Sequence, residues 1–230
     1  MIQNKRDLGG IMASDGRRIR PGMLVRSAHL SQAEDADLQG IASVIDLRTT
    51  GERQEAPDQA HGREYLPIPI FDGVLAGVSH EQETENAGIP DMAILYGRIV
   101  RECAASFRRV LLAVMEHDFA RGAILWHCTE GKDRCGLTTA LALEALGVDR
   151  DTILADYLKT NEVNLPKAIS IRREVAAIHG EAVAESVYKA YIADERYLRT
   201  AWEAMGDDYL TGTLGIPADT ITRFRQSVLA

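Results

Sequence analysis

The stretch Gly122–Gly136 constrains the fold more than any other part of the sequence. Its apolar run 123–126 has the length expected of a buried strand, and a polar turn, 128–134, follows it. Residues 137–146 are then almost wholly apolar and end at Gly147, a common helix terminator. This order of strand, tight loop and helix predicts an α/β fold. We expect helices to flank a central, mainly parallel sheet, with the loop at the carboxyl edge of this strand.

The loop itself is typical of an anion-binding site. Where a loop enters a helix, successive backbone N–H groups point inward, and the helix dipole favours negative charge at that end. The planar guanidinium of Arg134 can bind two phosphoryl oxygens at once, and Lys132 adds a point charge. Glu130 is unusual in such a site and is expected to face outward. The residues expected to bind phosphate are Thr129, Glu130, Gly131, Lys132, Asp133 and Arg134.

Cys128 has the surroundings of a nucleophile. A thiol attacks as the thiolate, and a helix N-terminus with a neighbouring cation lowers a cysteine pKa from about 8.5 into the range of roughly 3.5 to 7.5. Asp133 could supply a proton to the leaving oxygen. These residues predict phosphoryl transfer without a metal or cofactor. The Cys128 thiolate attacks phosphorus, a cysteinyl phosphate forms, and water releases the phosphate.

The spacing of His127, Cys128 and Arg134 resembles the phosphate-binding loop of the cysteine-dependent protein tyrosine phosphatase superfamily. The fuller string His-Cys-x-x-Gly-Lys-Asp-Arg is similar to that of its bacterial tyrosine and lipid phosphatase branch. The resemblance covers nearly the whole chain, through Asn4–Gly10, Leu24–Ala28, Val44–Thr49 with Glu52, and residues 209–229. It implies a phosphatase-like domain with Cys128 as nucleophile, Arg134 as the clamp on the phosphoryl group and Asp133 as general acid.

One position departs from the family pattern. Family members usually carry Thr or Ser directly after the loop arginine, where the hydroxyl is thought to assist the cysteine as it leaves phosphorus. Here that position is Cys135, and a thiol is a weaker hydrogen-bond donor than a hydroxyl. We expect slower breakdown of the phosphoenzyme. Cys135 is also a candidate partner for a redox disulfide with Cys128.

Asp72 is a second candidate for the general acid. It precedes an acidic stretch without clear elements that runs to Pro90, and such a loop of about 18 residues is often a functional flap. Other branches of the superfamily carry their general acid on a mobile loop. The alternative is that Asp72 is only a turn residue before Gly73. We favour Asp133, because it lies in the loop and geometry is the first requirement for proton transfer.

The segments before the loop predict short strands and one short helix. Ser31 and Glu34 form a capping-box pattern for a helix that ends near Leu38. The expected strands are residues 43–47, an edge or irregular segment at 65–70 whose prolines alternate, and short strands within residues 4–30.

Three charged residues near the N-terminus, Arg6, Asp7 and Arg26, have two interpretations. They are either substrate contacts or partners of one another that hold the N-terminal segment on the sheet. The second is the more common fate of charged residues near turns.

The rest of the chain predicts helices. Residues Asp91–His117 have the clearest amphipathic spacing, with Cys103 on the apolar face as a packed core thiol. A helical elaboration of about 151–205 follows the loop, with a break at His179–Gly180. Its helices either cover the pocket as a lid, as in some members of the branch, or form a layer on one sheet face. We treat 1–230 as a single phosphatase domain.

Charge and composition limit the partners. The net charge of −8 and the pI near 5.3 argue against nucleic acid and against permanent membrane attachment through basic patches. The N-terminus has no apolar signal region, and three cysteines fit reduced thiols, so the chain as given is expected to be cytoplasmic. Secretion is not excluded, because a signal peptide could have been removed. The sequence does not indicate the oligomeric state.

Other chemistries fit the loop less well. Asp133 stands where a nucleotide-binding loop needs Ser or Thr, and no zinc-binding spacing includes His127, Cys128 and Cys135. His127 is expected to order the loop, because it leaves the strand on the face opposite Cys128. A non-catalytic phosphate-binding module remains the alternative of another class, although a binder needs no nucleophile.

The substrate is the least determined feature of the sequence. Lysines at the position of Lys132 recognise additional ring phosphates in lipid phosphatases, which favours a phosphoinositide or broad specificity. The acidic net charge opposes an approach to an anionic leaflet. We therefore rank phosphotyrosine protein first and phosphoinositide or broad activity second.

Overall fold

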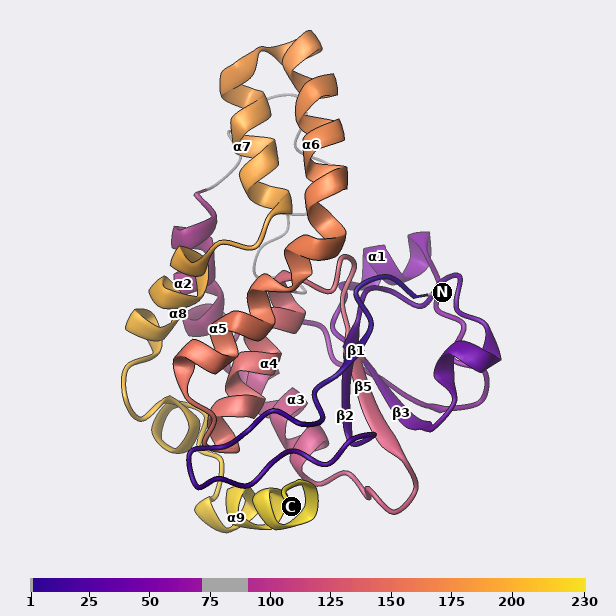
Figure 1. The fold of residues 1–230 in the computed structure, drawn as a ribbon, viewed down its shortest axis with the longest axis vertical. Helices are drawn as coiled ribbons and strands as arrows, with labels where there is room; N and C mark the ends of the chain where they lie inside the picture. The colour runs from indigo at the N-terminus through magenta and orange to yellow at the C-terminus, as the bar shows by residue number, and fades with distance from the viewer. Residues whose placement is uncertain (1, 72–90) are drawn as a thin grey trace.

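A five-stranded sheet forms the centre of the computed structural model, which describes residues 2–71 and 91–230 (Figure 1). Its described strands are β1 (Arg6–Asp7), β2 (Leu24–Ser27), β3 (Ile41–Asp46), β4 (Glu64–Pro67) and β5 (Ala123–His127). Their order across the sheet is β1-β2-β5-β3-β4. Only the β1–β2 pair is antiparallel among these strands. The predicted α/β fold with a mainly parallel sheet is therefore confirmed.

β5 suits the middle of the sheet because its first four side chains, residues 123–126, are apolar on both faces. All five of its residues are buried, as expected of a parallel strand that is covered on both sides. β4 lies at the edge, where the backbone of Pro67 need not donate to a further strand. The loop that follows β5 leaves the carboxyl edge of the sheet, as predicted.

Helices surround the sheet and continue beyond it. The described α-helices are α1 (Thr50–Glu55), α2 (Met92–Glu102), α3 (Ala104–Met115), α4 (Asp133–Ala145), α5 (Arg150–Leu158), α6 (Thr160–His179), α7 (Glu181–Tyr191), α8 (Glu195–Met205) and α9 (Ala218–Val228). A 3₁₀ helix spans Asp35–Leu38 and a π-helix spans Tyr209–Thr213. No helix of the described residues is both long and apolar enough to cross a membrane.

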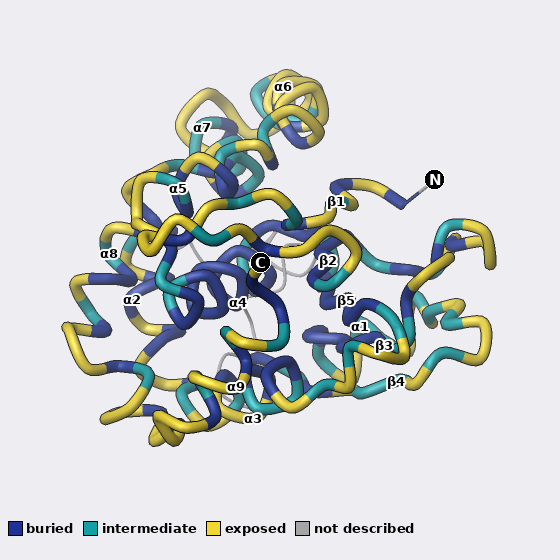
Figure 2. Tube along the Cα trace, turned by 60° about the horizontal axis from the view of Figure 1, so that its bottom comes forward, coloured by how far each residue is buried: buried dark blue, intermediate teal, exposed yellow. Residues whose placement is uncertain are grey.

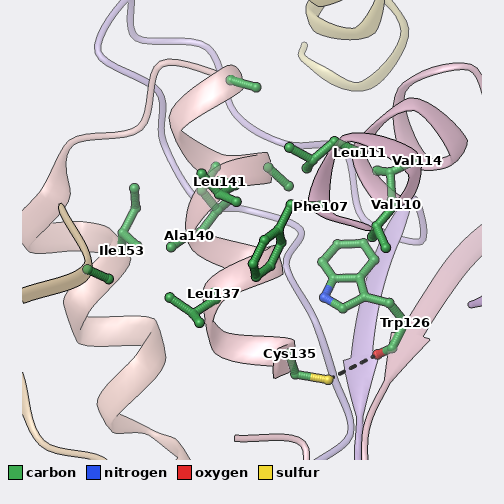
Figure 3. Close-up of a cluster of buried hydrophobic side chains, with 14 of the residues drawn as sticks. Phe107, Val110, Leu111, Val114, Trp126, Cys135, Leu137, Ala140, Leu141 and Ile153 are labelled. Atoms are coloured by element: carbon green, nitrogen blue, oxygen red, sulfur yellow. Dashed lines mark hydrogen bonds between the residues drawn. The ribbon is translucent and has the colours of Figure 1, made fainter. Parts of the chain in front are cut away.

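The main hydrophobic core lies between one face of the sheet and the helices. Trp126 of β5 packs there with Phe107 and Val110 of α3 and with Leu137 and Leu141 of α4 (Figure 3). α4 is buried along almost its whole length, as its dark blue trace in Figure 2 shows. A smaller cluster covers the opposite face, where Val44 and Leu125 contact the segment that carries the 3₁₀ helix.

The predicted long helix Asp91–His117 is in fact two helices that meet at Cys103. Cys103 has φ −104° and ψ 19°, outside the helical range, and it ends α2. α2 packs on α8, whereas α3 packs on α4 and α9, so one straight helix could not serve both sets of partners. Cys103 is buried in the core, as predicted.

The predicted capping box at Ser31 and Glu34 is also wrong. The box is formed one turn later by Glu34 and Asp37, which cap the 3₁₀ helix. The Ser31 hydroxyl instead lies 2.8 Å from Nδ1 of His29. The local contact of the Ser31 hydroxyl with His29 thus competes with its use as a helix cap.

α6 and α7 pack against each other and extend away from the body as a hairpin (Figure 1). The predicted break at His179–Gly180 is confirmed, because Gly180 has φ 84° between the two helices. These two helices do not form a layer on a sheet face. The part of α6–α7 near the sheet lies close to the loop after β5, because Lys167 of α6 bonds Glu130 of that loop.

Candidate active site

The loop between β5 and α4 places Cys128 at the centre of the site. Cys128 follows the last residue of β5 and is 3% exposed. Three residues later Gly131 has φ +66°, and a Cβ there would lie 2.7 Å from the carbonyl carbon of Ser27. The loop can therefore pass β2 this closely only with glycine at position 131.

Residues from the N-terminal part of the chain hold the loop from outside. Asn4 Nδ2 donates to the carbonyl oxygens of Gly131 (2.9 Å) and Glu130 (3.2 Å). Arg26 Nη2 donates to the Gly131 oxygen at 2.6 Å. The N–H of a peptide unit points opposite to its C=O, so these bonds direct the N–H groups of Gly131 and Lys132 to the other side of the loop.

Arg6 and Arg26 share one carboxylate. Arg6 Nε lies 2.9 Å from Asp156 Oδ1, and Arg26 Nη1 lies 3.2 Å from Asp156 Oδ2. Asp7 does not join them, because its carboxylate accepts the N–H groups of Gly9 and Gly22. The side chains of Arg6, Asp7 and Arg26 thus do not pair with one another, although Arg6 lies opposite Arg26 in the β1–β2 ladder. The partner that the sequence did not predict is Asp156 of α5.

Cys128 has an acidic thiol in spite of its burial. Burial raises the pKa of Cys128, but a hydrogen bond with the Cys135 thiol and the charge of Arg134 lower it to about 6. Cys135 is fully buried, and its pKa is raised well above the ordinary value by burial and by Cys128. It stays protonated and can donate, so Cys128 is the thiolate of the pair at neutral pH.

Glu52 of α1 holds the loop arginine. Its two carboxylate oxygens lie 2.6 Å from Nη1 and Nη2 of Arg134, and its Oε1 accepts the Thr129 hydroxyl at 2.5 Å. Burial opposes ionisation, but Arg134 keeps the pKa of Glu52 well below its usual range. The sequence pattern did not predict this role. The available signal was the capping box of Thr49 and Glu52, which fixes Glu52 on the first turn of α1.

Lys132 and Asp133, the predicted cation and the predicted general acid of the loop, lie side by side. Asp133 opens α4, and its Oδ1 lies 2.6 Å from the Tyr96 hydroxyl and 3.2 Å from Lys132 Nζ. Lys132 is 1% exposed, and its Nζ donates to the carbonyl oxygens of Ala190, in the last turn of α7, and of Ile192, directly after that helix. In this structure Lys132 therefore joins the loop to the hairpin.

Glu130 lies at the rim of the loop and pairs with α6. Its carboxylate is 2.6 Å from Lys167 Nζ, and Lys167 also lies 5.3 Å from the centre of the Tyr191 ring. The charge of Glu130 is thus opposed locally, as a carboxylate in an anion site requires. Asp72, the rival general acid, lies outside the described residues. Its neighbour Phe71 places its ring 5.7 Å from the guanidinium of Arg134.

His127 belongs to a buried ionic cluster behind the loop. Its Nε2 lies 2.9 Å from Asp58, and Arg48 Nη2 lies 2.8 Å from both Asp46 and Asp58. Burial lowers the pKa of His127, but its bond with Asp58 raises it overall. Asp46, Asp58 and His127 are close enough to hold a metal ion, yet the Arg48 guanidinium already supplies the positive charge.

Comparison with known proteins identifies the family. The chain matches the model of the family described as "Tyrosine phosphatase family" over residues 1–230. The chain belongs to this tyrosine phosphatase family. A Cupriavidus necator protein named provisionally as a tyrosine-protein phosphatase is 30% identical over 226 residues, which cover 88% of this chain and 82% of the relative.

A second relative of this phosphatase is the triple specificity protein phosphatase PtpB of Mycobacterium tuberculosis. It is 31% identical over 183 residues, which cover 66% of this chain and 65% of PtpB. Among solved structures, the crystal structure of TpbA from P. aeruginosa has a TM-score of 0.31 and 18% identity, and it covers 81% of this chain and 91% of TpbA. The predicted cysteine-dependent phosphatase family is confirmed by the family match and the relatives.

Proposed function

We propose that this phosphatase hydrolyses phosphomonoesters through a covalent cysteinyl phosphate. Cys128 is the nucleophile, Arg134 and the N–H groups of residues 129–134 bind the equatorial oxygens, and Asp133 is the general acid. The observation that carries the proposal is the position of the buried Cys128 thiol in the loop between β5 and the N-terminus of α4, beside Arg134, where its pKa is lowered to about 6. For the Cys103 thiol, burial is the largest influence, and its pKa is raised instead.

The reaction proceeds in two displacements. Cys128 Sγ bonds to phosphorus, the bond to the leaving oxygen breaks, and Asp133 gives that oxygen its proton. A water oxygen then attacks phosphorus, the Asp133 carboxylate takes the water proton, and Sγ leaves as thiolate beside the Cys135 thiol. The Glu52 carboxylate bonds one N–H on each of Nη1 and Nη2 of Arg134, so the guanidinium keeps further donors for phosphoryl oxygens.

Phosphotyrosine in a protein is the substrate that we rank first. Cys128 is 3% exposed, so a long aryl phosphate suits its depth. At the rim, Glu130 already pairs with Lys167, so neither side chain offers an unpaired cation to a ring with several phosphates. Lys132 Nζ already bonds the carbonyl oxygens of Ala190 and Ile192 and lies 3.2 Å from Asp133 Oδ1, so its three N–H donors have acceptors without a second phosphate.

Phosphoinositide or broad activity is the second candidate, and one relative favours it, because PtpB is named for triple specificity. A panel of phosphotyrosine peptides, phosphoserine peptides and soluble phosphoinositides, ranked by kcat/KM, separates the two. We expect phosphotyrosine peptides to lead. A tenfold lead of phosphoinositides, about 1.4 kcal/mol of transition-state preference, that Lys132→Ala erases would make this a lipid phosphatase.

The mechanism is tested by turnover of para-nitrophenyl phosphate in EDTA. We expect the wild type to turn over, Cys128→Ser to be inactive, and Arg134→Ala to lose about 10²-fold or more in kcat, as for the loss of an oxyanion donor. The matched control is Cys103→Ala, which removes another buried thiol and should keep full activity. No turnover by the wild type would indicate a phosphate-binding module without catalysis.

A further inference from the structure

Two tyrosines outside the loop form a hydrogen-bond chain that ends at the carboxyl group of Asp133. The hydroxyl of Tyr96, on α2, donates to Asp133 Oδ1 at 2.6 Å. The hydroxyl of Tyr157, on α5, lies 2.7 Å from that of Tyr96. Both side chains are buried, with 0% and 1% of their surface exposed. The helices α2, α4 and α5 thus meet at a chain of three polar groups inside an apolar core.

The direction of this hydrogen-bond chain follows from the donors available. Burial raises the pKa of both Tyr96 and Tyr157 well above the ordinary value, so both phenols keep their protons. The single proton of Tyr96 is given to Asp133, and Tyr96 can then only accept from Tyr157. The chain therefore runs from Tyr157 to Tyr96 to Asp133 Oδ1.

This arrangement distinguishes the two oxygens of the Asp133 carboxyl group. Oδ1 receives the Tyr96 hydroxyl and also lies 3.2 Å from Lys132 Nζ. A proton on Oδ1 would compete with both donors, so the acid form of Asp133 places its proton on Oδ2. A fixed carboxyl group with its proton on a fixed oxygen is what a general acid requires.

We propose that Tyr96, supported by Tyr157, is a positioning residue that orients Asp133 and directs its acid proton to Oδ2 for transfer to the leaving group. This inference rests on the proposed role of Asp133 as general acid. The Tyr96 hydroxyl bonds Asp133 and the Tyr157 hydroxyl bonds Tyr96, so their effect on the reaction passes through Asp133. Substrates that need protonation of the leaving oxygen should depend on them, and substrates with acidic leaving groups should not.

The test is the dependence of kcat on the leaving group in a series of aryl phosphates, from 2,4-dinitrophenyl phosphate to phenyl phosphate. For Tyr96→Phe we expect about a tenfold lower kcat on phenyl phosphate, the rate equivalent of one hydrogen bond of about 1.4 kcal/mol, and an unchanged KM. On 2,4-dinitrophenyl phosphate the loss should stay below about twofold, because that leaving group needs no proton. Tyr157→Phe should show the same pattern more weakly.

A matched control is Tyr209→Phe. The Tyr209 hydroxyl is also buried and donates to α2, at the carbonyl oxygen of Val100, but it makes no contact with Asp133. Its loss should lower stability as much as Tyr96→Phe does, without changing the leaving-group dependence. Adding Tyr96→Phe to Asp133→Asn should leave that dependence as it is in Asp133→Asn alone.

The results separate this inference from the proposed function. If Asp133→Asn steepens the leaving-group dependence but Tyr96→Phe lowers kcat equally on all substrates, Tyr96 has only a structural role and the inference is wrong. If kcat of Tyr96→Phe depends on the leaving group as kcat of the wild type does, with equal values, the inference is also wrong. If Asp133→Asn itself leaves the dependence unchanged, Asp133 is not the general acid, and both statements are wrong.

Discussion

Cys135 contributes to the acidity of the Cys128 thiol. A hydrogen bond between the Cys135 thiol and Cys128 lowers the pKa of Cys128, and Cys135 Sγ also lies 3.5 Å and 3.7 Å from the carbonyl oxygens of Ser27 and Trp126, which can accept the same proton. The last contact joins α4 to β5 (Figure 3). The Cys135 thiol therefore lies between β2, β5 and the loop.

We predict that Cys135→Ala raises the pKa of Cys128 above its value of about 6. The lost donor stabilises the thiolate and not the thiol, so its removal shifts the titration upward, by about one unit for one hydrogen bond. The rate of alkylation by iodoacetamide, measured against pH, reports the midpoint. Cys135→Ser, which restores a donor, should return it to the wild-type range. An unmoved midpoint in Cys135→Ala would show that Arg134 alone sets the pKa.

Glu52 sets the direction of the loop arginine. We predict that Glu52→Gln lowers kcat/KM by about tenfold or more, because the amide loses the charge that holds both Nη groups of Arg134. Gln keeps the capping position on α1, so the fold should survive. The control is Glu55→Gln on the same helix, where the side chain is exposed and activity should not change. Equal activity of the two variants would contradict this role of Glu52.

At the scale of elements, the sequence predicts best where local pattern and tertiary contact agree. The strand, loop and helix around Cys128 were predictable because apolar runs and glycines mark each boundary. The break at Cys103 was not, because the apolar spacing continues through it and only the separate partners of α2 and α3 end the helix. The bonds from Asn4 and Glu52 to the loop cross more than 70 residues, and no local pattern encodes such contacts.

The first turn of α4 depends on close contact with α5. A Cβ at Gly136 would lie 2.8 Å from Cε2 of Tyr157, so one of the two must move. We predict that Gly136→Ala lowers the free energy of unfolding by about 1 to 3 kcal/mol, as overpacking does, and also displaces the Tyr157 hydroxyl. Urea denaturation measures the free energy of unfolding. A displaced Tyr157 hydroxyl should appear as a changed dependence of kcat on the leaving group.

The control for this helix prediction is Gly51→Ala on α1. Gly51 is also helical, but a Cβ there would meet nothing within 4 Å. Alanine should raise the free energy of unfolding by about 0.5 to 1 kcal/mol, because it restricts the unfolded chain. If both variants are stabilised, the contact between α4 and α5 is looser than the structure indicates.

At the scale of the whole molecule, one buried carboxylate joins three distant parts of the chain. Asp156 of α5 bonds Arg6 of β1 and Arg26 of β2, and Arg26 in turn bonds the loop carbonyl of Gly131. Arg26 is 0% exposed and Asp156 is 3% exposed. The N-terminal strands, the helical layer and the loop are thereby fixed relative to one another, so the site is built only when the whole chain has folded.

This network makes stability depend on pH in a defined direction. Burial raises the pKa of Asp156, but the charges of Arg26 and Arg6 outweigh it and hold the pKa below the ordinary value. The folded protein therefore binds this proton less well than the unfolded chain, where the pKa is about 3.9. The stability that Asp156 contributes is present above pH of about 4 and is lost as the pH falls through the folded pKa.

We predict that Asp156→Asn lowers the free energy of unfolding by about 3 kcal/mol at pH 7, because two guanidinium groups lose their shared counter-charge. As the pH falls below about 4, the unfolded chain binds the Asp156 proton first and the folded protein binds it only at its lower pKa, so the difference in stability between the two proteins should shrink. Glu52, Asp58 and His127 also titrate with shifted pKa values, but they are present in both proteins and cancel in the difference. Urea denaturation from pH 7 to pH 3 measures that difference.

Asp151→Asn, an exposed carboxylate on the same helix, should change stability by less than about 0.5 kcal/mol throughout. A difference between Asp156→Asn and wild type that stays constant down to pH 3 would mean that the shape of the side chain, and not its charge, joins these three parts of the chain.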